Sequence, residues 1–378
     1  MIYFDNAATT IMSEAALDAL MEASKNQYGN PSSVYGFGRE SKDLLEQSRK
    51  IIAACIGAEP EEIYFTSCGT ESDNWVISQI GSFWDSAITT AVEHHAILYP
   101  AEEKAAEGYN IRFLAVDENC MVSEDAMQSA LTGAPELVSV MLQNNEVGTI
   151  QNIKRLAKIV HKSNEKSLFH TDAVQAIGHI PVNVKDLAVD MLSASAHKFN
   201  GPKGIGFLYI RKGCNLKAFI LGGGQEKRMR SGTENVASIY SMARALQDNV
   251  NNMDAVHEHV FKLEKYFTTL LKRAGIQFRI NGDSDNRATG ILNIAFEDLD
   301  GEGLMNMLDM HDICISIGSA CNSKSQDRSH VLQAMGLSES HIDSSVRISI
   351  GRFNTEKDVE TLVKWIRKYR EVTVLADS

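Results

Sequence analysis

The chain has 378 residues, of which 44% are hydrophobic and 23% charged, and its formal net charge is -12. This balance is typical of a globular protein with a large core and argues against a disordered or fibrous class. A strongly negative chain also lacks the clustered Lys and Arg that binding to nucleic acid or to an anionic membrane requires as a main function.

The sequence shows no sign of export or of membrane insertion. No apolar run approaches the roughly 18 to 20 residues of a membrane span, and the first residues lack the basic and apolar regions of a secretion signal. We therefore expect a cytoplasmic protein. The six cysteines are scattered without a C-x-x-C pair, which predicts neither a zinc site nor a disulfide framework.

Stretches typical of strands and of helices alternate through the first two thirds of the chain. The strands are expected at 2–4, 63–66, 87–92, 111–116, 137–143, 167–170 and 191–194. The helices are expected after a cap at Ser13, before Gly57, and at 71–80, 97–108, 124–131 and 153–164. This alternation predicts an α/β fold with a mostly parallel sheet that is covered by helices on both faces.

The pattern changes near residue 249. A helix at 256–274, strands at 277–280 and 291–296, a helix at 303–311, a strand at 346–350 and a final helix follow. Thr355 and Asp358 form a capping box for that final helix. We predict a large domain over 13–248 and a smaller α+β domain over 249–378, with residues 1–12 packing on the small one.

The stretch 193–206 places a lysine at the end of a strand. Lys198 follows a run of small and apolar residues and precedes a Gly/Pro turn and the apolar run 207–210. An amine flanked by His197 and by small residues suits a Schiff-base lysine. A solvated turn lysine explains this stretch alone equally well.

Polar clusters follow several of the expected strands. The cluster 67–72, Ser-Cys-Gly-Thr-Glu-Ser, opens a helix and suits a phosphate, although a simple helix cap is the alternative. Asp172 and Gln175 could reach the same side of a flat ligand, and an N-cap is the alternative for Asp172. Since ligands of doubly wound sheets bind beyond the carboxyl ends of the strands, we expect these clusters to converge.

Three further segments could take part in chemistry. His94 could stack on a ring or move a proton, although a lone histidine is more often structural. The donor-rich loop 222–233 could complete an anion site or be a solvated surface loop. Cys321 lies in a small, polar loop beside Lys324 and Arg328, where a thiol could act as a nucleophile, although most cysteines are buried and inert.

Taken together, these segments resemble the cysteine desulfurases, pyridoxal-phosphate enzymes of the aspartate-aminotransferase fold (fold type I) that take sulfur from L-cysteine and leave L-alanine. The resemblance covers nearly the whole chain, at 3–10, 29–33, 70–74, 93–94, 144–148, 172–175, 197–198, 230–233, 318–321 and 347–349. Gly-Ser-Ala-Cys at 318–321 resembles the group with a long flexible Cys loop, here expected over 319–331.

The resemblance implies a role for each residue around the cofactor, pyridoxal 5'-phosphate. Lys198 would hold it as a Schiff base and later move the Cα proton of the substrate. Asp172 would pair with the pyridine nitrogen, Gln175 with the phenolic oxygen, and His94 would stack on the ring. The residues expected at the phosphate are Gly69, Thr70, Ser195, His197 and, from the neighbouring subunit of a homodimer, Thr233.

The resemblance also implies how substrate and sulfur are handled. Asn145 and Arg347 would hold the substrate carboxylate, and Cys321 would attack the sulfur and carry a persulfide. The acceptor would be an iron-sulfur scaffold or a tRNA-thiolation enzyme, with no metal, direct nucleic acid or membrane involved. A selenocysteine lyase and an aminotransferase of the same fold are the alternatives. The chain departs from the family pattern at Cys68, where glycine is usual, and in the polar segment 324–328.

Overall fold

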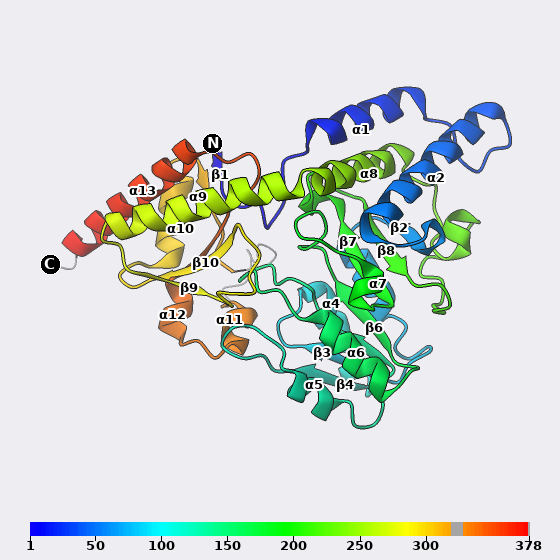
Figure 1. The fold of residues 1–378 in the computed structure, drawn as a ribbon, viewed down its shortest axis with the longest axis horizontal. Helices are drawn as coiled ribbons and strands as arrows, with labels where there is room; N and C mark the ends of the chain where they lie inside the picture. The colour runs from blue at the N-terminus through cyan, green and yellow to red at the C-terminus, as the bar shows by residue number, and fades with distance from the viewer. Residues whose placement is uncertain (319–327, 377–378) are drawn as a thin grey trace.

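The computed structural model describes residues 1–318 and 328–376 (Figure 1). A seven-stranded sheet forms its larger part, with the order β2-β8-β7-β6-β5-β3-β4. The strands are β2 (Ile63–Thr66), β3 (Ser86–Thr90), β4 (Asn110–Leu114), β5 (Leu137–Ser139), β6 (Leu168–Asp172), β7 (Met191–Ser195) and β8 (Gly206–Ile210). β8 runs antiparallel to both of its neighbours, and the other pairs are parallel, so the predicted mostly parallel sheet is confirmed.

Helices cover both faces of this sheet because its central strands are apolar on both sides. Phe207 of β8 belongs to a core cluster with side chains of α2 (Gly36–Ile56), α6 (Ile153–Ser163) and α8 (Val236–Asn251). The next residue, Leu208, points to the opposite face and joins a cluster with α3 (Gly69–Ile77) and α4 (His95–Ala106). Adjacent residues of one strand therefore contribute to two different core layers.

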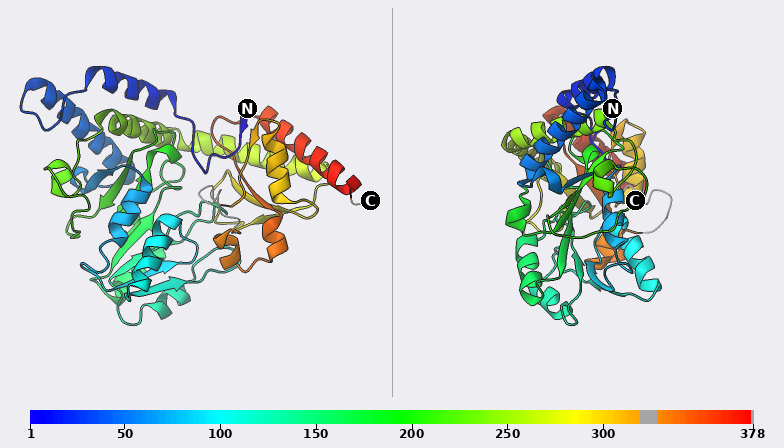
Figure 2. Two further views of the ribbon diagram at one scale, coloured as in Figure 1. Left: turned by 180° about the vertical axis from the view of Figure 1, so that it is seen from behind. Right: turned by 90° about the vertical axis from the view of Figure 1, so that its right-hand side faces the viewer.

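A second, antiparallel sheet has the order β12-β10-β9. Its strands are β9 (Phe278–Asn281), β10 (Ile291–Phe296) and β12 (Ser345–Ser349), and it packs with α9 (Met253–Arg273), α10 (Gly301–Asp309) and α13 (Glu356–Ala376) around a core of its own. Figure 2 shows this part, yellow to red, beside the large sheet, cyan to green. The capping box of α13 is confirmed, since Thr355 and Asp358 exchange hydrogen bonds between side chain and backbone N-H.

The amino-terminal residues reach across to the small sheet. β1 (Ile2–Tyr3) pairs in parallel with β11 (Ile313–Cys314), and Phe4 is buried in the core of the small sheet. The predicted boundary at 248/249 falls inside α8, which is separated from α9 by Asn252 alone. The division into two domains stays a prediction.

The remaining helices are short except for the first. Ser13 caps α1 (Glu14–Asn26) as predicted, its Oγ accepting from the Ala16 N-H. α5 (Glu124–Ala130) matches a predicted helix, whereas α7 (Val184–Leu187), α11 (His330–Ala334) and α12 (Glu339–Asp343) were not predicted. Within the described residues, no helix is long and apolar enough to cross a bilayer.

Several predicted boundaries differ from the structure. The strand expected at 137–143 ends at Ser139, and the loop around Cys321 ends earlier than expected. The loop containing Cys321 was expected to extend to Val331, but Val331 lies in α11 and is fully buried. The helix begins earlier because Ser329 caps it, its Oγ accepting from the Leu332 N-H at 3.1 Å. Residues 319–327, with Cys321 and Lys324, lie outside the described residues.

Candidate active site

A cavity of about 160 Å³ lies beyond the carboxyl ends of β6 and β7, beside the start of α3. Ala7 and Ala8 from the amino-terminal segment and Arg347 from β12 complete its wall, so both sheets contribute to it. The predicted site residues that line it are Gly69, Thr70, His94, Asn145, Asp172, Gln175, Ser195, His197, Lys198 and Arg347. The expected convergence of the strand-end clusters is therefore present in the fold.

Lys198 ends the 3-10 turn Ala196–Lys198 that follows β7. Its Nζ donates to the carbonyls of Ala7 at 2.6 Å and Ala8 at 3.0 Å. Its own carbonyl accepts from His179 Nε2 at 2.7 Å, which fixes the backbone of the turn. The amine is thus directed into the cavity and held against the amino-terminal segment, and Lys198 is not a solvated turn lysine.

Asp172 is the last residue of β6 and is 5% exposed. One carboxylate oxygen accepts from the Val174 N-H at 2.8 Å. Burial raises the pKa of Asp172 to about 6, while the Val174 N-H and Lys198 oppose that rise. Nearby, Gln175 Nε2 donates to the Ala7 carbonyl at 2.8 Å, so one amide hydrogen is already engaged.

His94 is the N-cap of α4, where its Nδ1 accepts from the Ala96 N-H at 3.1 Å. Burial lowers the pKa of His94 to about 4, and the charge of Lys198 lowers it further. The ring is therefore neutral at physiological pH and suits stacking on a flat ligand. His95 instead lies in a stack with Tyr99, at 4.5 Å between ring centroids, and does not line the cavity.

The start of α3 forms the anion end of the cavity. The N-cap residue, Cys68, makes no side-chain cap, so the first N-H groups of the helix lack that partner. A Cβ on Gly69 would lie 2.6 Å from Val174 Cγ2, which explains why glycine occupies this position. Ser195 Oγ is buried and has no hydrogen-bond partner within the described chain.

His197 stands beside this anion end. Its Nδ1 lies 3.1 Å from Thr9 Oγ1. Burial lowers the pKa of His197 to about 4, with smaller effects from Lys198 and Lys203, so it would meet a phosphate as a neutral donor. An unpartnered hydroxyl, a helix start, an amine, a buried carboxyl group and a neutral flat ring together fit pyridoxal phosphate.

Arg347 is 1% exposed and comes from the centre of β12. Its Nη1 donates to the Asn145 carbonyl at 3.0 Å and its Nη2 to Asp5 Oδ1 at 2.9 Å, while Nε has no partner among the described residues. The guanidinium group is thus fixed in place and retains a donor for an anion. Asn145 and Arg347 are brought together as the resemblance implies.

The loop 222–233 is connected to the anion end without entering the cavity. Arg230 pairs with Glu71 of α3 through two hydrogen bonds, of 2.7 and 3.0 Å. Thr233 is exposed and does not line the cavity of its own chain. Arg328, expected beside Cys321, pairs with Asp343 at 2.7 Å and Glu339 at 3.0 Å, so its charge is engaged by α12.

Asp73 and Gln143 are two buried polar residues of the cavity wall that were not predicted as site residues. Asp73 is 1% exposed, and burial and the neighbouring Asp172 raise its pKa well above its ordinary value. Asp73 follows Gly69 by four residues, and residues at this spacing share one face of a helix. This spacing could have predicted that Asp73 lies at the same cavity as Gly69. Gln143 is 2% exposed and belongs to the polar cluster that follows β5.

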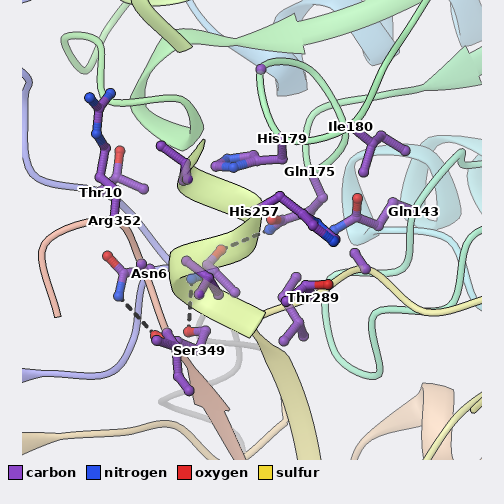
Figure 3. A pocket seen from close by; sticks show the side chains of 18 of the residues that line it. Asn6, Thr10, Gln143, Gln175, His179, Ile180, His257, Thr289, Ser349 and Arg352 are labelled. Atoms are coloured by element: carbon purple, nitrogen blue, oxygen red, sulfur yellow. Dashed lines mark hydrogen bonds between the residues drawn. The ribbon is translucent and has the colours of Figure 1, made fainter. Parts of the chain in front are cut away.

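A second cavity, of about 170 Å³, adjoins the first (Figure 3). Ala7, Gln143 and Gln175 line both. Its other walls come from α9 and from the ends of the small sheet, with His179 and His257 among its side chains. Gln143 and Gln175 therefore separate the candidate active site from a space between the two sheets.

Comparison with known proteins agrees with this geometry. The model of the family "Aminotransferase class-V" matches residues 2–362. A cysteine desulfurase IscS of Methanosarcina thermophila is 41% identical over 96% of this chain and 90% of the relative, and one of Dictyoglomus turgidum is 40% identical over 98% and 96%.

Solved structures show the same relationship. A NifS-like protein superposes with a TM-score of 0.91 at 36% identity, covering 99% of both chains. SspA, solved in complex with cysteine, superposes with a TM-score of 0.83 at 30% identity, over 94% of this chain and all of that one. The chain belongs to the class-V aminotransferase family and, within it, to the cysteine desulfurases, which depend on pyridoxal phosphate.

Proposed function

We propose that this chain transfers sulfur from L-cysteine to Cys321 with the help of Lys198, and then passes it to an acceptor protein. The observation that carries the proposal is that Lys198, Asp172, His94 and Arg347, which come from different parts of the chain, line one buried cavity. This set combines a reactive amine, a cofactor partner and a binding group for a carboxylate.

The residues at the carboxyl ends of the large sheet would bind the cofactor. When bound, pyridoxal phosphate supplies an electron-withdrawing ring that stabilises negative charge on the substrate Cα. Asp172 would keep the pyridine nitrogen protonated, Gln175 would bind the phenolic oxygen, and neutral His94 would cover the ring. The phosphate would be held by the N-H groups of Gly69 and Thr70, and by Ser195 and His197.

The remaining groups act on the substrate. Arg347 and Asn145 hold its carboxylate, which orients the Cα-H bond toward Lys198. Lys198 removes the Cα proton and later supplies a proton for the product. Cys321, as a thiolate, attacks the substrate sulfur, so that the C-S bond breaks and an S-S bond forms. L-cysteine and one enzyme thiol thus give L-alanine and one enzyme persulfide, with atoms and electrons balanced.

The names of the relatives support the choice of substrate and acceptor. SspA was solved with cysteine bound, and relatives named IscS support delivery of the sulfur to iron-sulfur cluster assembly. A tRNA-thiolation enzyme is the second candidate acceptor. The exposed position of Thr233 outside its own cavity supports a homodimer in which Thr233 binds the phosphate of the partner subunit. We propose that this homodimer acts in the cytoplasm.

The test is a comparison of the wild-type enzyme with Cys321→Ala and Lys198→Ala in the presence of L-cysteine. The wild type should release L-alanine and form a persulfide on Cys321, and both variants should lose this activity. An aminotransferase has no need of Cys321, and a selenocysteine lyase would prefer selenocysteine and tolerate Cys321→Ala. Persulfide-loaded enzyme should then transfer labelled sulfur to an iron-sulfur scaffold protein rather than to a tRNA-thiolation enzyme.

The dimer can be tested with mixed subunits. Lys198→Ala and Thr233→Ala homodimers should each have low activity. Mixed dimers of the two should regain activity in one of their two sites, because one site then combines an intact Lys198 with an intact Thr233. If mixing restores no activity, Thr233 does not act across the interface.

A further inference from the structure

The two ends of the segment that contains Cys321 meet at one buried carboxyl group. Ser329 Oγ donates to Glu146 Oε2 at 2.5 Å. A Cβ added to Gly318 would lie 3.4 Å from Ser329 Cβ and 3.7 Å from Glu146 Oε2. Gly318 and Ser329 therefore lie side by side against Glu146, which is fully buried.

Glu146 is itself held rigidly next to a substrate-binding residue. The N-H groups of Glu146 and Val147 donate to Asn144 Oδ1 at 2.8 and 3.0 Å, which closes the turn containing Asn145. Glu146 Oε1 is buried without a partner among the described residues. A buried carboxyl oxygen without a partner is costly, so its presence beside a reactive loop calls for a functional reason.

The chain just before Gly318 is hydrogen-bonded to the second substrate-binding residue, Arg347. Ser316 and Arg347 exchange both backbone hydrogen bonds, at 3.1 and 2.6 Å. Arg347 Nη1 in turn donates to the Asn145 carbonyl. Hydrogen bonds therefore connect the start of the loop to Arg347, Arg347 to Asn145, and the residue after Asn145 to the end of the loop.

We propose that Glu146 is a positioning residue for sulfur transfer. Its carboxyl group holds Ser329 by a hydrogen bond, and Gly318 lies against Ser329, so the two residues that flank the segment with Cys321 are fixed relative to Asn145 and Arg347. Cys321 follows Gly318 by only three residues in the sequence, so the position of Gly318 limits how far the thiol can reach. The inference rests on the proposed function, because it takes Cys321 as the sulfur acceptor.

The test uses the cofactor-loaded enzyme and separates substrate binding from sulfur transfer. Ser329→Ala removes the hydroxyl donor, Ser329→Thr keeps it, and Glu146→Gln replaces one carboxyl oxygen by an NH2 group. Ser338→Ala is the matched control, since Ser338 caps α12 with its Oγ as Ser329 caps α11. L-cysteine affinity is measured from the cofactor absorbance, and persulfide formation on Cys321 by alkylation and mass spectrometry in a single turnover.

We expect the rate of persulfide formation to fall about tenfold or more in Ser329→Ala and Glu146→Gln, because a misplaced reacting group reduces rate more than affinity. L-cysteine affinity should change less than about threefold, since Asn145 and Arg347 remain in place. Ser329→Thr should restore the rate, and Ser338→Ala should behave as the wild type.

Two results would overturn the inference. The first is a wild-type rate of persulfide formation in both Ser329→Ala and Glu146→Gln. The second is an equal loss in Ser329→Ala and Ser338→Ala, which would assign the effect to helix capping. Failure of the proposed function would give a different result. In that case Cys321→Ala would still release alanine from cysteine at the wild-type rate, whatever the effect of the Glu146 variants.

Discussion

Glu93 is a buried carboxyl group beside the active site whose titration should control stability. It is fully buried, its Oε1 accepts from Thr90 Oγ1 at 2.8 Å and from the Met141 N-H at 2.9 Å, and its Oε2 has no partner in the described part of the chain. Burial raises the pKa of Glu93 from 4.5 to about 8, against the opposing effect of these two hydrogen bonds. Glu93 is therefore protonated in the folded protein at neutral pH.

The size of the effect follows from proton linkage. Between pH 4.5 and about 8 the folded state keeps a proton on Glu93 that the unfolded state has released. The contribution of Glu93 to stability is fully present below pH 4.5 and is lost as the pH rises through about 8. At about 1.4 kcal/mol per pH unit, the loss from pH 5.5 to pH 7.5 is about 2 to 3 kcal/mol.

The perturbation is Glu93→Gln, which keeps the size of the side chain and removes its titration. The free energy of unfolding of the cofactor-loaded protein is measured by urea titration at pH 5.5, 6.5 and 7.5. The difference between variant and wild type should shift by about 2 to 3 kcal/mol in favour of the variant over this range. Glu102→Gln, at an exposed position of α4, controls for the loss of one carboxylate. A difference that does not vary with pH would refute the reasoning.

Three further predictions concern the cofactor, the core and the substrate. The affinity of the apoenzyme for pyridoxal phosphate should fall about tenfold from pH 7 to pH 5, because the Asp172 pKa is about 6 and, in the proposed function, only the ionised form would pair with the pyridine nitrogen. Equilibrium dialysis should show no such dependence for Asp172→Asn. Glu226→Ala should lower the free energy of unfolding by about 3 to 5 kcal/mol, because it leaves the guanidinium group of Arg49, which is 4% exposed, without its bidentate partner. The double variant Arg49→Met/Glu226→Leu has no buried charge at this place and should be more stable than Glu226→Ala in a urea titration. Equal stability of the two variants would contradict this reasoning. Arg347→Lys should lower kcat/KM for L-cysteine about 10- to 100-fold in steady-state kinetics, because an ammonium group cannot replace the fixed donors of the guanidinium; an unchanged KM would count against a role in binding.

Much of the candidate site could be predicted because short sequence patterns mark the ends of the strands. Strand periodicity places Asp172 at the end of one strand and Lys198 in the turn after the next strand, and ligands bind at such ends in this fold class. The short helix α11 was not predicted, since one turn of helix carries too little periodicity to recognise. The pKa values of His94 and Asp172 depend on burial, which is a property of the assembled core and not of neighbouring residues in the sequence.

The least predictable contacts are those between distant parts of the chain. Asp5 and Arg347 are 342 residues apart in sequence, yet they form an ion pair of 2.9 Å, and Arg347 lines the cavity. No short sequence pattern predicts such an ion pair. The resemblance indicated Arg347 as a substrate residue, but only the fold shows that Asp5 and the Asn145 carbonyl hold it in place.

The contacts of residues 2–5 with β11 and β12 have a consequence for biosynthesis. β1 has its only strand partner in β11, among the described residues, and Asp5 forms an ion pair with Arg347 of β12. Residues 2–5 can therefore form these contacts only after residues 313–347 have been translated. Ala7 and Ala8, which hold the amine of Lys198, belong to that same segment. We therefore expect Lys198 to reach its final environment only after translation of β12, and a ribosome-bound chain arrested before residue 345 to bind the cofactor poorly.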